Sequence, residues 1–392
     1  MEVETIKKEV GVSWKFEKLS SISEILMGQS PEGNSYNNKG IGLPLLNGAA
    51  DYKGDKFTPK KFTTSPTKIA IKGDILLGIR ATIGNLAISN TDYCIGRGLA
   101  AIRVNESKAH IGFVLHFLSE QIGKLSSEAA GSTIKGIVKE DLFDMLIPLP
   151  PLTTQKRIAE ILDAADALKR KDQELLKKYD ELAQAIFIDM FGDPVKNEKG
   201  WEKVKMEKLM TIVRGGSPRP IDKFLGGKYP WIKIGDATKG DDVYLNSTRE
   251  HIIEEGLSKT RLLPAGSLIF ANCGVSLGFA RIITFEGCIH DGWLAFSDFD
   301  DLKINKIFLL KALNSITQYF RDSAPEGTQP NLNTSIIKDF ELILPPMSLQ
   351  NKFELILSSF KGIKENAECN FKNSNHLFDS IIQKAFKGEL VA

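Results

Sequence analysis

The sequence predicts an α+β protein. Two similar mixed α/β domains, related as a pseudo-two-fold internal repeat, are separated by two long helices that form an antiparallel coiled coil. Three observations predict this fold class: sequence landmarks recur in order, short apolar runs end at turn residues, and heptad spacing follows each of two proline pairs. The length of 392 residues allows two to three domains. With 42% hydrophobic and 26% charged residues, the composition is that of a soluble globular protein, which excludes disorder as the dominant state.

The internal repeat is visible as pairs of matching segments. The segment at Trp14 resembles the one at Trp201, an offset of 187 residues, and Pro150 matches Pro345 at an offset of 195. A slowly growing offset is what duplication followed by loop insertions would produce. Further pairs lie between these two: Ser30-Pro31 with Ser217-Pro218, Gly73-Asp74 with Gly266-Ser267, Cys94-Ile95 with Cys288-Ile289, and Gly131-Ser132-Thr133 with Gly327-Thr328-Gln329.

Each half begins with a region of expected strands and one helix. Short apolar runs between Gly, Pro, Asn and Asp are typical of strands. We expect Cys94 and Cys288, which hold matching positions, to be small core residues rather than nucleophiles. The expected strands cover 68–71, 75–79 and 99–104 in the first half and 231–234, 268–271 and 294–296 in the second, and the expected helices cover 110–125 and 305–321.

A long helix is expected after each proline pair, over 152–191 and 347–388. Apolar residues there alternate at spacings of three and four, which is typical of a coiled-coil seam. Helices of roughly 55 Å have too little local core to stand alone, so the two seams are expected to pack on each other. The alternative is that each helix lies on its own domain. The expected seam residues are Ile158, Ile161, Ala165, Leu168, Leu175, Tyr179, Leu182 and Ile186, with polar Asp172 between Leu168 and Leu175, and Phe353, Ile356, Phe360, Ile363, Ala367, polar Asn370, Ser374, Leu377 and Ile381.

These elements predict the domain boundaries. Glycines at 192 and 388 are expected to end the two helices, because glycine readily adopts the left-handed conformation that follows a helix. The expected segments are an N-terminal tail at 1–12, the first domain at 13–151, a polar linker at 192–200, and the second domain at 201–346.

Several classes of protein are excluded by the sequence. No run approaches 18 apolar residues, and the first residues carry no apolar stretch, so neither a membrane span nor a secretory signal is expected. The four cysteines form no C-x-x-C pair, which argues against a disulfide framework or a zinc site and favours a reducing cytoplasm. Nucleotide-binding glycine loops, zinc-protease motifs and nucleophile elbows are absent. We therefore expect no catalytic residue, no metal and no cofactor in this chain.

Polar loops at matched positions are the candidate binding surface. Glycine lets a backbone approach a phosphate, Arg can read guanine, and Asn or Gln can read adenine. The net charge of +2 neither indicates nor excludes a nucleic-acid partner. For any single residue a solvated turn is the alternative, and for His290 it is a structural histidine. The candidate DNA-binding residues are Gln29, Ser30, Pro31, Tyr36, Asn47, Arg80, Thr82, Arg97, Thr133, Lys135, Arg214, Ser217, Pro218, Arg219, Lys233, Asn272, Ser276, Gln329 and Asn331.

Five segments give the chain a family resemblance over about 13–390. They are IPLPPLTTQKRIAEIL at 147–162, LILPPMSLQNKFELIL at 342–357, MGQSPEGNSYN at 27–37, GSTIKGI at 131–137 and QKAFKGEL at 383–390. Together they resemble the specificity subunit of type I restriction–modification systems. The resemblance implies that each domain is a target-recognition domain for one half of an asymmetric, bipartite double-stranded DNA target. The family's DNA-contacting loops would correspond to 29–36, 132–135, 217–219 and 328–331.

The resemblance also implies partners. The long helices would set the spacer between the half-sites and dock two methyltransferase subunits, which carry S-adenosylmethionine. Motor–endonuclease subunits would bring ATP and Mg. This chain would then be the non-catalytic recognition subunit of an adenine-specific DNA methyltransferase and ATP-dependent endonuclease.

Two other functions are open at this point. The first is an enzyme with an unrecognised site, such as a fused nuclease or methyltransferase, which binding of S-adenosylmethionine to the purified chain would favour. The second is a two-lobed protein-binding scaffold without a DNA role, which the absence of DNA contact in a methyltransferase complex would favour.

Overall fold

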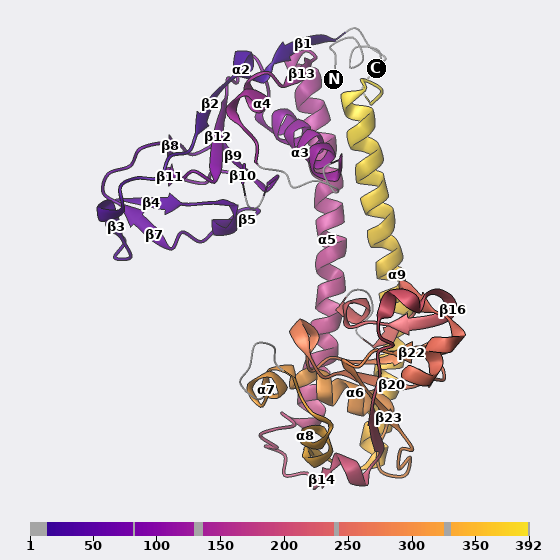
Figure 1. Ribbon diagram of the computed structural model, residues 1–392. Coiled ribbons are helices and arrows are strands. Elements are labelled where there is room, and N and C mark those ends of the chain that lie inside the picture. The colour runs from indigo at the N-terminus through magenta and orange to yellow at the C-terminus, as the bar shows by residue number, and fades with distance from the viewer. Residues whose placement is uncertain (1–13, 81–82, 129–135, 239–242, 325–330, 391–392) are drawn as a thin grey trace. The chain divides into compact units, whose positions relative to one another are not determined.

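The computed structural model describes residues 14–80, 83–128, 136–238, 243–324 and 331–390 (Figure 1). The chain divides into two compact units, residues 1–173 with 369–392 and residues 174–368. Each unit therefore holds one mixed domain and one half of each long helix. Among the described helices, none combines the length and hydropathy that a membrane span requires.

The first unit is built around a four-stranded antiparallel sheet of order β10-β9-β12-β2. A five-stranded sheet of order β3-β7-β4-β11-β8 packs on one of its faces, and β4 and β11 of that sheet are parallel. Strands β1 and β13 form a separate antiparallel pair, as do β5 and β6. The strands are β1 (Lys15–Lys18), β2 (Ser23–Met27), β3 (Tyr36–Asn37), β4 (Leu43–Leu46), β5 (Tyr52–Lys53), β6 (Lys56–Phe57), β7 (Lys61–Thr63), β8 (Ile69–Ala70), β9 (Ile75–Gly78), β10 (Leu86–Ile88), β11 (Tyr93–Ile95), β12 (Leu99–Val104) and β13 (Leu146–Leu149), and the helices of this domain are α2 (Leu19–Ile22), α3 (Ile111–Glu128) and α4 (Lys139–Phe143).

The second unit repeats this plan. A five-stranded sheet of order β15-β23-β20-β21-β17 corresponds to the first four-stranded sheet with one strand added, and a sheet of order β18-β16-β22-β19 packs beside it. The parallel pair recurs as β16 and β22. The strands are β14 (Lys203–Lys205), β15 (Thr211–Arg214), β16 (Leu225–Ile232), β17 (Tyr244–Leu245), β18 (Glu250–Ile252), β19 (Arg261–Leu263), β20 (Leu268–Ala271), β21 (Ala280–Ile283), β22 (Gly287–Ile289), β23 (Trp293–Ser297) and β24 (Glu341–Ile343), and the helices of this domain are α6 (Lys306–Ser315), α7 (Thr317–Asp322) and α8 (Thr334–Asp339).

The sheet β10-β9-β12-β2 of the first unit and the sheet β15-β23-β20-β21-β17 of the second are each covered on both faces. Their central strands β9 and β20 are therefore apolar at every position. Along β9, Ile75 and Leu77 face the helices, whereas Leu76 faces the second sheet. Along β20, Leu268 and Phe270 face the helices of the second unit. This alternation follows from the two-residue period of a strand. The repeat predicted from the sequence is thus confirmed as a repeat of strand order and of core.

The matched cysteines are core residues, as expected. Cys94 pairs with Leu45 across the parallel strands of the first unit, and Cys288 pairs with Trp231 at the same place in the second. Both thiols are fully buried. Burial, followed by the charge of Glu286, raises the pKa of Cys288 to about 11, so this thiol is a poor nucleophile at neutral pH.

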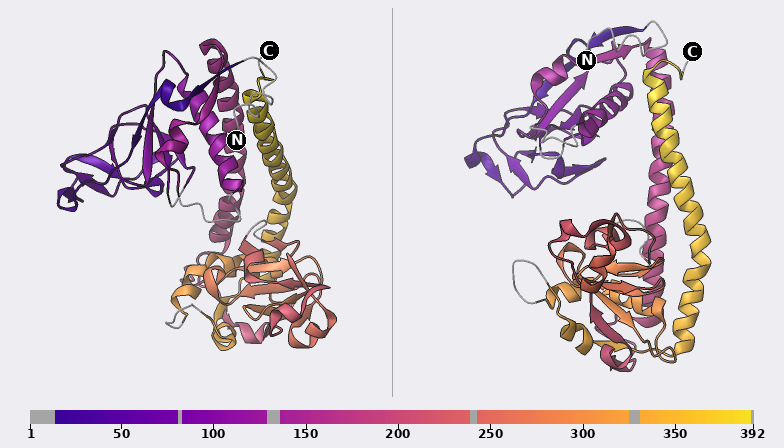
Figure 2. Two further views of the ribbon diagram at one scale, coloured as in Figure 1. Left: turned by 45° about the horizontal axis from the view of Figure 1, so that its top comes forward. Right: turned by 45° about the vertical axis from the view of Figure 1, so that its right-hand side comes forward.

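Helices α5 (Leu152–Phe191) and α9 (Met347–Phe386) each span 40 residues (Figure 2). In the first unit, Lys169 Nζ lies 4.4 Å from the centroid of the Phe378 ring. In the second unit, Lys364 Nζ lies 2.9 Å from Asp180 Oδ1, and the Phe187 and Phe353 rings are 5.5 Å apart. The contacts run in opposite order along the two helices, which confirms the predicted antiparallel pairing.

The predicted seam is wrong at several positions. Leu168, Leu175 and Leu182 keep 46%, 41% and 42% of their surface exposed. The alternative, that each helix also lies on its own domain, is true as well: Ile158 and Leu162 belong to the same core as α3. Helix α5 therefore divides its apolar residues between its own domain and its partner helix, and these three leucines stay partly exposed. The remaining exposed members of the predicted seam on α9 are Ile363 and Leu377.

Candidate nucleic-acid interface

The candidate site of the first unit forms where four strands end around the turn between β11 and β12. Backbone hydrogen bonds join this turn, Gly96-Arg97-Gly98, and its flanking residues to three other segments, and a further bond joins a fourth segment to Ile79. They are Gly28 N–H to Leu99 O (2.8 Å), Gln29 N–H to Ile95 O (2.9 Å), Gly96 N–H to Leu46 O (2.7 Å), Ile79 N–H to Gly98 O (3.0 Å) and Ile137 N–H to Ile79 O (2.9 Å). Segments far apart in the sequence therefore meet at one surface.

Glycine is required where these segments approach each other. A Cβ at Gly28 would lie 2.2 Å from Gly96 O, and one at Gly98 would lie 2.7 Å from Asn47 O. Gly96 O also accepts a hydrogen bond from Leu99 N–H at 3.0 Å, which fixes its position. The glycines of these loops thus serve the close packing of the loops on each other.

Four of the predicted side chains project from this turn and its neighbours. Gln29, Asn47, Arg80 and Arg97 are exposed. Within the part of the chain that the structure describes, none of the four has a side-chain hydrogen bond or an ion pair. Unpaired guanidinium and amide groups on one surface are free to bind phosphates or base edges.

The other predicted residues of the first unit have different surroundings. Pro31 is buried, and its carbonyl accepts a hydrogen bond from the Tyr36 hydroxyl at 3.0 Å, so these two residues shape the loop. Ser30 is half-buried beside them. Thr82, Thr133 and Lys135 lie outside the described residues.

The second unit holds the corresponding turn, His290-Asp291-Gly292, with the same set of backbone bonds. They are Gly215 N–H to Trp293 O (2.9 Å), Gly216 N–H to Ile289 O (3.1 Å), His290 N–H to Ile232 O (3.1 Å), Asn272 N–H to Gly292 O (3.0 Å) and Leu332 N–H to Asn272 O (2.8 Å). Each bond has its counterpart in the first unit. The two sites are therefore one backbone framework used twice.

The side chains that this framework presents differ between the units. Asp291 stands where the first unit has Arg97, and Lys233 stands where it has Asn47. Lys233 Nζ lies 2.5 Å from Glu250 Oε1 and 5.4 Å from the centroid of the Trp231 ring. The paired glutamate holds this cation in place, in contrast to the free groups of the first unit.

Asp291, which sequence reasoning missed, organises the second site. Its carboxylate Oδ1 accepts from Ser217 Oγ at 2.9 Å, and its Oδ2 lies 3.5 Å from Arg219 Nη2. Its backbone carbonyl accepts from Arg214 Nε at 2.7 Å. Burial opposes the charge of Asp291, but the Ser217 hydroxyl and the neighbouring positive charges outweigh it and lower its pKa. The signal for Asp291 was its alignment with Arg97 in the repeat.

His290 has the structural role that was its alternative. Its Nδ1 accepts a hydrogen bond from Gly292 N–H at 2.9 Å, and its ring packs 5.6 Å from that of Trp231. Burial lowers the pKa of His290, and the nearby Asp291 carboxylate only partly opposes this. His290 thus stabilises the turn as a neutral ring.

Two predicted residues of the second unit lie beneath the surface. Asn272 and Ser276 have no exposed area, and Asn272 Nδ2 donates to Leu332 O at 3.0 Å. Asn272 therefore holds strand ends together, and neither side chain faces the surface. Asn331 and Arg219 are exposed, and Pro218 is buried. Gln329 lies outside the described residues.

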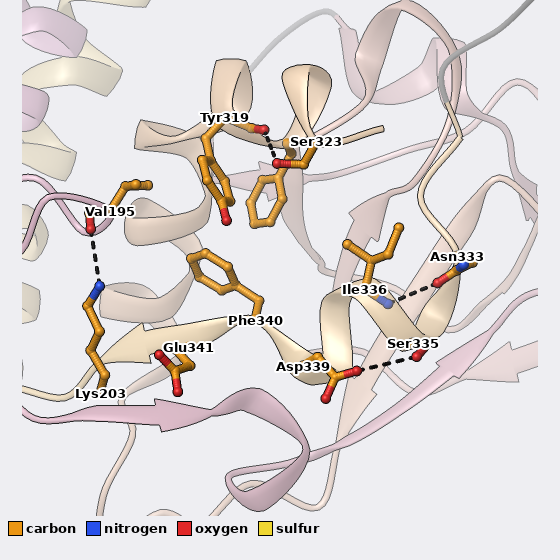
Figure 3. A pocket seen from close by; sticks show the side chains of 11 residues that line it. Val195, Lys203, Tyr319, Ser323, Asn333, Ser335, Ile336, Asp339, Phe340 and Glu341 are labelled. Atoms are coloured by element: carbon orange, nitrogen blue, oxygen red, sulfur yellow. Dashed lines mark hydrogen bonds between the residues drawn. The ribbon is translucent and has the colours of Figure 1, made fainter. Parts of the chain in front are cut away.

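A surface cavity of about 510 Å³ lies elsewhere in the second unit (Figure 3). Its lining includes the aromatic rings of Tyr319, Phe320 and Phe340 and the carboxylates of Asp339 and Glu341. None of the predicted site residues that the structure describes lines it. Among the described residues, no group of three His, Cys, Asp or Glu side chains is placed to hold a metal ion.

Residues 11–178 and 198–369 each match the type I restriction modification DNA specificity domain. The MjaIX specificity subunit of Methanocaldococcus jannaschii is 26% identical over 422 aligned positions, which cover 99% of this chain and 96% of that protein. A putative MjaX specificity subunit of the same organism is 39% identical over 175 residues, 43% of this chain and 41% of that protein. The EcoKI specificity subunit of Escherichia coli is 24% identical and covers 97% of this chain and 89% of its own length.

Solved structures share the fold. A chain from a type I restriction–modification system aligns with a TM-score of 0.58 at 18% identity and covers 97% of this chain and 99% of its own. The S subunit of a type I system from M. genitalium aligns with a TM-score of 0.54 at 15% identity and covers 96% of both chains. At sequence identities of 18% and 15%, these alignments show a shared fold only.

Two copies of one recognition fold, joined through a pair of long helices, define a two-domain DNA specificity protein. The chain belongs to the family of type I restriction–modification specificity subunits and carries two copies of its DNA specificity domain.

Proposed function

We propose that each unit reads one half of an asymmetric, bipartite double-stranded DNA target. The observation that carries this proposal is the shared backbone framework around Arg97 and Asp291, which presents different side chains in its two copies. Equal frameworks would dock on DNA in equal ways, whereas unequal side chains would prefer unequal base sequences. Residues 13–151 and 201–346 are the reading domains in this proposal, and 192–200 is the linker.

The long helices have two roles in this proposal, which are to fix the spacer between the half-sites and to dock two methyltransferase subunits. The exposed leucines of α5 support the docking role, since Leu175 and Leu182 recur at a spacing of seven and keep over two fifths of their surface exposed. S-adenosylmethionine, ATP and Mg belong to the methyltransferase and motor–endonuclease partners. This chain supplies no catalytic residue and acts in the cytoplasm, where its DNA partner is.

The test is to co-express the chain with its methyltransferase subunit in a methylation-free host and to map methylated adenines by long-read sequencing. Methylation at a two-part asymmetric motif is the expected result. If the methyltransferase subunit is folded and bound to the chain but no adenine is methylated, the proposal fails. The chain is then a scaffold or an inactive subunit. Because the net charge is only +2, we expect modest DNA affinity for the chain alone, with the partners adding phosphate contacts.

A further inference from the structure

The two matched turns carry opposite charges at their central residue. Arg97 is exposed, and the Asp291 side chain keeps 34% of its surface exposed. Both residues sit between the same backbone bonds, so the protein offers a guanidinium in one copy and a carboxylate in the other at one place of a common framework.

The backbone bonds of the turn are the same with either side chain at its centre. In the first unit the backbone bonds of Gly96 and Gly98 hold the turn while Arg97 makes no side-chain bond within the described residues. The corresponding bonds of His290 and Gly292 hold it in the second unit. The same turn backbone thus carries either charge, although the Asp291 side chain also bonds Ser217 and Arg219 in the second unit.

Phosphate binding does not explain a carboxylate at this position. A carboxylate repels phosphate, whereas Arg214 and Arg219 beside it attract phosphate. An ionised carboxylate only accepts hydrogen bonds and has about four acceptor positions. In Asp291, Oδ1 accepts from Ser217 Oγ at 2.9 Å and Oδ2 accepts from Arg219 Nη2 at 3.5 Å, so about two acceptor positions remain for a base.

We propose that residues 97 and 291 are the matched specificity-determining positions of the two domains. Arg97 donates to the O6 and N7 atoms of a guanine in one half-site, and Asp291 accepts from the exocyclic amino group of a cytosine or adenine in the other. This inference rests on the proposed function, because it needs each unit to contact one half-site.

The experiment uses the full chain co-expressed with its methyltransferase subunit, and long-read sequencing gives the methylated motif of each variant. In Asp291→Ala, one position of one half-site loses its preference for an amino-bearing base, with discrimination falling by roughly ten- to hundredfold, while the other half-site is unchanged. In Asp291→Arg, the same position gains a preference for guanine. In Arg97→Ala, the relaxed position lies in the other half-site.

Controls separate direct reading from other roles. Asp301→Ala removes an exposed carboxylate outside the turn and leaves the motif as it is. Arg219→Ala relaxing the same base position as Asp291→Ala would show that Asp291 acts through Arg219, which overturns the inference. An unchanged motif in both Asp291 variants, or relaxation spread over many positions, also overturns it. If the parent chain methylates no bipartite motif at all, the proposed function itself has failed, which the parent measurement reveals separately.

Discussion

Gln155 and Gln350 make the same hydrogen bonds in the two units. Gln155 Oε1 accepts from His110 N–H at 2.8 Å, and its Nε2 donates to Pro150 O at 2.8 Å. Gln350 Oε1 accepts from Asn305 N–H at 2.9 Å, and its Nε2 donates to Pro345 O at 2.8 Å. Each fully buried glutamine thus ties the start of a long helix to the domain helix beside it.

We expect Gln155→Ala to destabilise the first unit by about 1–3 kcal/mol, because it leaves a buried N–H and a buried carbonyl without partners. Gln350→Ala should do the same in the second unit. Chemical denaturation followed by circular dichroism measures the loss. The exposed Gln383→Ala is the matched control and should change stability by less than about 0.5 kcal/mol. Equal stabilities for Gln155→Ala and Gln383→Ala would contradict the role.

The exposed leucines of α5 should matter for assembly rather than for folding. Leu175→Glu and Leu182→Glu are expected to leave the thermal midpoint nearly unchanged, because these side chains are already over two fifths exposed. They should weaken co-purification of the methyltransferase subunit at least tenfold, because a charge would be buried in the interface. Gln173→Glu adds the same charge two residues from Leu175, on another face of the helix. As the control, Gln173→Glu should retain the methyltransferase subunit fully. Full retention by both leucine variants would contradict the proposed docking role of this surface.

The free energy of unfolding should fall at alkaline pH, and the buried Cys288 thiol should account for part of this fall. Its folded-state pKa of about 11 lies above the ordinary thiol value of 9.0, so between these values the unfolded chain has lost the proton that the folded chain keeps. Unfolding free energy therefore decreases as pH rises through this window, by at most about 1.4 kcal/mol per pH unit for one group. Denaturation of Cys288→Ala at pH 9 and pH 11 should show a smaller decrease than the parent. The exposed Cys369→Ala should follow the parent, and a parent-like slope for Cys288→Ala would contradict the assignment.

The helix pair should act as a ruler. Inserting seven residues, about two helical turns, after Lys171 and a matching seven after His376 keeps the heptad phase of both helices. We expect the methylated motif to keep both half-site sequences and to change only in the length of the spacer. The control variant replaces seven residues at each of these two places and leaves both helices at their original length. A lengthened pair with an unaltered spacer would refute the ruler.

The local sequence determined much of this protein. Alternation within strands, turn residues and the two proline pairs predicted the repeat, the mixed domains and the two long helices, because these features depend on short-range periodicity. Matching segments such as those at Trp14 and Trp201 identified the second copy. The motifs around Gln155 and Gln350 pointed to the family.

Tertiary structure decided which residues act together. The exposure of Leu168, Leu175 and Leu182 follows from packing α5 on its domain and on α9 at once, which heptad spacing cannot express. The gathering of Gln29, Asn47 and Arg97, and the central place of Asp291, come from strand ends that lie far apart in the sequence. Hydrogen bonds between such distant segments depend on the closed fold, and a linear pattern of residues does not contain them.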